Sequence, residues 1–133
     1  MIKGIDHVAV AVEDIDAALI LLGKIFGITP DHRETIVGYG VETATFKLGN
    51  TDIELVSGTT PDSPISKYIE KRGPGIHHIA LEVDDIAAAI ATVSENAEMI
   101  DTSARTGKDD SKVAFIHPRS TGKILFELVQ NRK

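Results

Sequence analysis

The chain of 133 residues repeats part of its own sequence, and this repeat constrains the fold more than any other feature. Residues 4–18 align with residues 75–89 without a gap, and nine of the fifteen positions are identical. Further along the chain, residues 49–56 resemble residues 122–129. Such self-similarity indicates that the chain contains two copies of one supersecondary unit.

The repeat therefore predicts two modules, at about 1–60 and 74–133. The segment between them, at about 61–73, is expected to be a turn-rich linker that continues into one or two helical turns over 65–71. We expect the two modules to form a single domain over 1–133, since the chain is long enough for one substantial core.

Both modules have the same predicted order of elements. Each begins with an alternating β-branched run (5–12 and 76–83) that is typical of a strand. Asp14 and Asp85 follow these runs and can cap the Ala-rich helices after them. Two or three short strands are expected after each helix, over 41–48 and 52–56 in the first module and over 113–117 and 124–130 in the second. The predicted fold class is α+β, with two tandem βαβββ modules.

Strand alternation places four ionisable residues at repeat-equivalent positions. In the first strand of each module the bulky apolar residues share one face, which is suited to packing against the helix, so His7 and His78 lie on the opposite face. In the last strand of each module, Glu54 and Glu127 are flanked by large apolar residues and point away from them. The four side chains are therefore expected to meet on one concave face.

This chemistry is typical of a metal site. The chain has no cysteine, so a metal would have to be bound by imidazole and carboxylate groups. Buried groups of these kinds are costly unless they are paired or bound to an ion. Recurrence in both halves favours function over packing, because packing preserves apolarity and not ionisability. Co²⁺ is the expected ion, with Mn²⁺, Ni²⁺, Zn²⁺ and Fe²⁺ as alternatives.

Composition excludes several other classes of protein. The formal net charge of −6 argues against a nucleic-acid partner, whose phosphates require a concentrated basic surface. No apolar run approaches the ~20 residues that a membrane span needs, and the first residues do not resemble a signal or transit peptide. A cytoplasmic location is therefore expected.

Several motifs together resemble those of the methylmalonyl-CoA epimerase family, within the vicinal-oxygen-chelate (glyoxalase/bleomycin resistance/dioxygenase) superfamily. The resemblance covers nearly the whole chain, and its motifs are Gly4-Ile5-Asp6-His7-Val8-Ala9, Asp62-Ser63-Pro64-Ile65, Gly75-Ile76-His77-His78-Ile79-Ala80, Phe115-Ile116-His117-Pro118 and Gly122-Lys123-Ile124-Leu125-Phe126-Glu127-Leu128. It implies a glyoxalase-like fold, in which the two modules form a curved mixed sheet around a metal site.

The resemblance also implies roles for individual residues. His7, His78 and Glu127 would bind the metal, with Glu54 at a fourth position where some members carry Gln. The substrate would be an acyl-CoA, and the reaction would interconvert (R)- and (S)-methylmalonyl-CoA by removing and returning the α-proton. Glu127 would be one acid/base and Glu42 the other, although some members place the second Glu one position later, where this chain has Thr43. The chain is expected to form a homodimer.

Other functions remain open at this point. A glyoxalase-type lyase or isomerase would use the same site on a thiol adduct, and an iron-dependent dioxygenase would use two His and one carboxylate. A non-catalytic binding protein of the superfamily is a further alternative. His77 is expected to be a neighbour of the site and not a ligand, because alternation points it to the opposite face from His78. His32 in a loop and His117 before a proline are expected to have structural or solvent-exposed roles.

Overall fold

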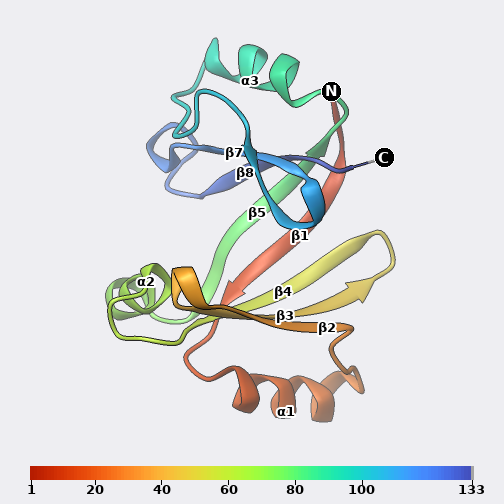
Figure 1. Cartoon of the computed structure of the whole chain (residues 1–133), viewed down its shortest axis with the longest axis vertical. Coiled ribbons are helices and arrows are strands. Elements are labelled where there is room, and N and C mark those ends of the chain that lie inside the picture. Colours follow the sequence, from red (N-terminus) through yellow and green to blue (C-terminus); the bar gives the residue numbers. More distant parts are fainter. Residues whose placement is uncertain (133) are drawn as a thin grey trace. The chain divides into compact units, whose positions relative to one another are not determined.

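The computed structural model describes residues 1–132, and its fold is α+β as predicted. The strand–helix–three-strand order occurs twice (Figure 1). The first copy comprises β1 (Ile2–Ala11), α1 (Ile15–Phe26), β2 (His32–Ile36), β3 (Val41–Leu48) and β4 (Thr51–Gly58). The second comprises β5 (Gly75–Val83), α3 (Ile86–Ser94), β6 (Arg105–Thr106), β7 (Lys112–Ile116) and β8 (Phe126–Gln130). Between them lies α2 (Pro64–Arg72), and short 3-10 turns cover Val37–Tyr39, Lys108–Asp110 and Pro118–Ser120.

The chain divides into two compact units. Unit 1 consists of Met1–His7 and the chain from His78 onward, and unit 2 consists of Val8–His77. The strands of unit 2 follow the order β2-β3-β4-β1, and those of unit 1 follow the order β1-β5-β8-β7-β6. Within residues 1–132, each helix is too short or too polar to cross a membrane.

The helices begin and end where the local sequence dictates. Asp14 accepts a hydrogen bond from the Ala17 amide at the start of α1, and Asp85 accepts one from the Ala88 amide at the start of α3. Both are N-caps, which satisfy amides that have no partner within the helix. α1 ends at Gly27, whose φ of 66° is in the left-handed region that glycine adopts most easily.

In unit 2, one face of the strands packs against α1. The buried residues of this cluster are Ile15, Ala44, Phe46 and Leu55, with Val10 of β1 and Val12 just after it packed beside them. Ala11, on the opposite face of β1, instead packs with Val56 and Ile65. The predicted division of β1 into two faces is therefore confirmed.

Unit 1 repeats the same division. The buried residues of α3 and of the strands beneath it form one cluster of Val83, Ile86, Ala89, Ile90, Met99, Ala114, Ile116 and Leu128. Ala80, Val113 and Val129 form a separate cluster on the other face of the same strands. β8 runs parallel to β5 and antiparallel to β7, so the sheet is mixed, as predicted.

The predicted βαβββ order includes β2 and β6, but the sequence did not show where these two strands lie. β2 is exposed along its whole length and β6 has only two residues, so neither carries the alternating apolar pattern by which a strand is predicted. His32 consequently opens β2, and the prediction that it lies in a loop was wrong. The two strands form because backbone hydrogen bonds to β3 and β7, and not side-chain burial, hold them.

Candidate metal centre

Three of the four predicted ligands converge within unit 1. His7 comes from β1, His78 from β5 and Glu127 from β8. The two Nε2 atoms of His7 and His78 lie 3.2 Å apart, and Glu127 Oε1 lies 3.3 Å from each of them. The side chains are 18%, 11% and 8% exposed, so the cluster is largely shielded from water.

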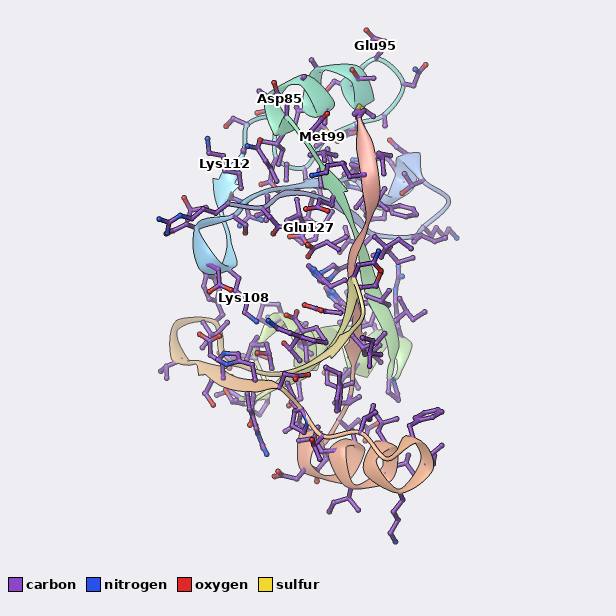
Figure 2. The ribbon with its side chains drawn as sticks, turned by 90° about the vertical axis from the view of Figure 1, so that its right-hand side faces the viewer. Asp85, Glu95, Met99, Lys108, Lys112 and Glu127 are labelled. Atoms are coloured by element: carbon purple, nitrogen blue, oxygen red, sulfur yellow. The ribbon has the colours of Figure 1, made fainter. Side chains whose placement is uncertain are left out.

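Strand register explains why these side chains meet. In the parallel pair of β5 and β8, Ala80 is the register partner of Glu127. His78 lies two residues before Ala80 on β5, so its side chain points to the same face of the sheet as Ala80 and Glu127. Ala80 is fully buried, and its single methyl group leaves room beside the carboxylate. Figure 2 shows Glu127 on the opposite side of the strands from Met99 and α3.

The Glu127 carboxylate is buried without adequate hydrogen bonding. Its Oε1 has no solvent contact and makes no hydrogen bond of good geometry among the described residues, although the two imidazoles are close. Burial by itself raises the pKa of Glu127, but the adjacent His7 and His78 rings outweigh it and hold the pKa below its ordinary value of 4.5. The group is therefore a carboxylate, which is the form that binds metal ions.

The spacing of the three atoms fits a divalent cation. They form a nearly equilateral triangle with sides of 3.2 and 3.3 Å. An ion placed ~2.1 Å from each atom would subtend angles of ~100°, between the octahedral and tetrahedral values. Such an ion would also satisfy the buried Oε1 of Glu127. The His/His/Glu cluster is thus consistent with a divalent metal site open on one side.

A residue that the sequence analysis did not single out orients His7. Asp6 Oδ2 lies 2.7 Å from His7 Nδ1, and the hydrogen bond with His7 is the main reason why the pKa of Asp6 is lowered. In the neutral ring, a proton on Nδ1 leaves Nε2 unprotonated, which is the form that binds a metal ion. Asp6 could have been found from its place directly before a predicted ligand. Alternation, however, assigned it to the opposite face.

Aromatic packing holds the other imidazole. The ring of Phe115 meets the ring of His78 edge to face, with centroids 5.4 Å apart. Phe115 is also the β7 register partner of Glu127, so it forms an apolar wall beside both ligands. The Arg105 guanidinium lies over Phe115 and pairs with Asp101.

The other two predicted site residues belong to unit 2. The register of β3 and β4 puts Glu54 opposite Thr45, on the sheet face away from α1. Glu42 shares the α1 face with Ala44, and it forms an ion pair of 2.6 Å with Arg33, which also pairs with Asp16 of α1. Glu42 and Glu54 therefore occupy opposite faces of the unit 2 sheet, and their roles stay predictions.

The remaining histidines lie outside the cluster. His77 packs against Tyr68 of α2, with ring centroids 4.7 Å apart. His32 is exposed and lies near Glu34, and His117 accepts a hydrogen bond from the Arg119 amide. The expected roles of the three agree with these contacts.

This fold and site define the class of protein. Residues 6–115 match the glyoxalase/bleomycin resistance protein/dioxygenase superfamily, and the chain belongs to it. Among its relatives, the mitochondrial methylmalonyl-CoA epimerase of Dictyostelium discoideum is 37% identical, over 93% of this chain and 76% of that protein. The uncharacterized protein YqjC of Bacillus subtilis is 34% identical, over 95% of this chain and 91% of that protein.

A solved structure shows the same similarity to methylmalonyl-CoA epimerases. A variant of the methylmalonyl-CoA epimerase of Streptomyces coelicolor, in complex with 2-nitronate-propionyl-CoA, superposes with a TM-score of 0.89 at 29% identity. The match covers 98% of this chain and 96% of that chain. The resemblance inferred from the sequence motifs is therefore confirmed.

Proposed function

We propose that this protein is a metal-dependent epimerase that interconverts (R)- and (S)-methylmalonyl-CoA. The observation that carries the proposal is the convergence of His7, His78 and Glu127 in a chain whose named relatives are methylmalonyl-CoA epimerases. The proposed ion is Co²⁺, with Mn²⁺, Ni²⁺, Zn²⁺ or Fe²⁺ as alternatives, and the donor set of two imidazoles and a carboxylate supports this range.

The chain's own residues would have to bind the cation, orient the thioester and move one proton. A divalent cation held here would supply Lewis-acid stabilisation of the negative charge that develops on the substrate oxygens. Asp6 would hold the Nδ1 proton of His7, so that the neutral ring presents Nε2 to a cation, and Phe115 packs against one side of His78. Glu54 is proposed as a fourth ligand.

Inversion requires a proton acceptor on one side of the α-carbon and a donor on the other. We propose Glu127 for one of these roles, and its support is its place in the cluster. Its lowered pKa suits a ligand better than a base, because a general base works best with a pKa near the working pH. Glu42 is proposed for the second role. It lies on the α1 face of the unit 2 sheet and pairs with Arg33, so it would have to leave both to reach the substrate.

Proton exchange at the α-carbon of methylmalonyl-CoA in D₂O tests the proposal. The protein loaded with Co²⁺ should incorporate deuterium, and a chelator should stop the incorporation until metal is restored. No exchange in the loaded protein would refute the epimerase assignment. Turnover of a hemithioacetal, or oxygen uptake with bound iron, would instead assign glyoxalase or dioxygenase chemistry.

Assembly and location are part of the same proposal. We propose a homodimer, in line with the family resemblance, and light scattering coupled to size-exclusion chromatography measures it directly. A cytoplasmic location is likewise proposed and can be measured by cell fractionation.

A further inference from the structure

A hydrogen-bonded chain connects His7 to the far end of the sequence. Asp6 uses both carboxylate oxygens: Oδ2 lies 2.7 Å from His7 Nδ1, and Oδ1 accepts a hydrogen bond of 2.7 Å from Asn131 Nδ2. The same amide nitrogen donates to Glu82 Oε2 at 2.9 Å. All four residues belong to unit 1, and Asn131 is 125 residues from Asp6 along the chain.

The chemistry of each group fixes the direction of these bonds. An ionised carboxylate only accepts, so His7 must carry a proton on Nδ1, and in the neutral ring this leaves the Nε2 atom, which faces His78 and Glu127, able to bind a cation. The Asn131 amide has two N–H bonds, one for each carboxylate that it contacts. Asn131 thereby holds Asp6 and Glu82 close together despite their like charges.

The second module has no residue equivalent to Asp6 beside its ligand histidine, His78. Asp6 aligns with His77, which is not a carboxylate and which packs against Tyr68 in unit 2. The ring of His78 instead rests on Phe115. The Asp6 carboxylate therefore has no counterpart at the repeat-equivalent position, and the Asp6–Asn131 pair belongs to the half of the site that His7 provides.

We infer that Asp6 is a positioning residue that sets the tautomer and orientation of His7 for metal binding, and that Asn131 holds Asp6 in place. A carboxylate bonded to the second nitrogen of a ligand histidine contributes about 10- to 100-fold to metal affinity. The inference rests on the metal site proposed above and not on the identity of the thioester.

Asp6→Asn tests the inference with little change in shape. An amide has one accepting end and one donating end, so it cannot accept from both His7 and Asn131. Titration of the apoprotein with Co²⁺ alone, by calorimetry, should show about 10- to 100-fold weaker binding. The visible absorption of bound Co²⁺ should also change. Asp84→Asn, at an exposed position of unit 1, is the matched control and should bind Co²⁺ like the wild type.

A second variant separates positioning from folding. Without the Asn131 amide, the asparagine at position 6 could turn its amide oxygen toward His7, so Asp6→Asn should cost less affinity in an Asn131→Ala background than alone. Additive losses in this cycle, or an unchanged Co²⁺ affinity of Asp6→Asn, would overturn the inference. Failure of the wild type to bind Co²⁺ would instead overturn the metal site itself.

Discussion

Replacing Glu127 with Gln is expected to abolish tight metal binding while leaving the apoprotein folded. Glu127 supplies the only negative charge among the three converging ligands, and its side chain is 8% exposed. In the loaded protein, Glu127 would form a buried charge pair with the cation, and removing one partner of such a pair costs about 3–5 kcal/mol. Since each ~1.4 kcal/mol is a factor of ten, the Co²⁺ affinity should fall by about two to four powers of ten.

The apoprotein should respond differently to the same change. The Glu127→Gln substitution would remove the burial penalty of a carboxylate whose Oε1 makes no good hydrogen bond, together with its attraction to His7 and His78. These effects oppose each other, so the free energy of unfolding without metal should change by no more than about 1 kcal/mol. The increase in Tm that metal causes in the wild type should disappear.

Calorimetric titration with Co²⁺ and thermal unfolding with and without the ion measure both effects. Glu98→Gln is the matched control, because Glu98 is an exposed carboxylate of unit 1 that pairs with Arg119. It should bind Co²⁺ like the wild type. A Glu127→Gln protein that binds Co²⁺ within tenfold of the wild type would refute the assignment of Glu127 as a ligand.

Three further predictions concern other parts of the molecule. Glu42→Gln should slow α-proton exchange at least ~100-fold without changing Co²⁺ affinity, whereas Glu54→Gln should weaken Co²⁺ binding. If Glu42→Gln weakened Co²⁺ binding and Glu54→Gln slowed only proton exchange, the two proposed roles would have to be swapped. Phe46→Ala should lower the free energy of unfolding by about 3–5 kcal/mol, measured by urea denaturation, because Phe46 is 1% exposed; a loss below about 1 kcal/mol would contradict its place in the core. Folding lowers the pKa values of Asp6 and Glu127 from their ordinary values of 3.8 and 4.5. The ionised carboxylates therefore stabilise the fold at pH values above these ordinary pKa values. This stabilisation is lost as the pH falls through the lower pKa values of the folded protein. Acid unfolding of the metal-free protein measures this loss, which Glu127→Gln should reduce.

Local rules predicted much of the fold. The helices begin at Asp14 and Asp85 because an N-cap depends only on the adjacent residues. Alternation assigned Glu127 to the face away from Leu128, and burial of Leu128 under α3 agrees with this assignment. β2 was missed because its residues are exposed and its stability comes from pairing with β3, which leaves no local pattern.

For the candidate site, too, the sequence predicted some residues correctly and the structure alone revealed other contacts. His7 and His78 were predicted as ligands because the repeat placed the same ionisable group on the same face twice. The role of Glu42 was predicted from the family resemblance and from its place on the strand before Glu54. The structure shows that Glu42 pairs with Arg33 across β2 and β3. A cross-strand partner of this kind depends on register, which the residues of a single strand do not specify.

The sequence alone determined the helix starts, most of the strands, the two-module order and the faces on which the histidines and glutamates lie, because alternation and capping act between residues a few positions apart. Only the tertiary structure decided how these groups meet. The parallel pairing of β5 with β8 placed Glu127 beside Ala80 and within 3.3 Å of both imidazoles. The bond from Asn131 to Asp6 likewise joins the two ends of the chain, and contacts so distant in sequence form only when the whole unit packs.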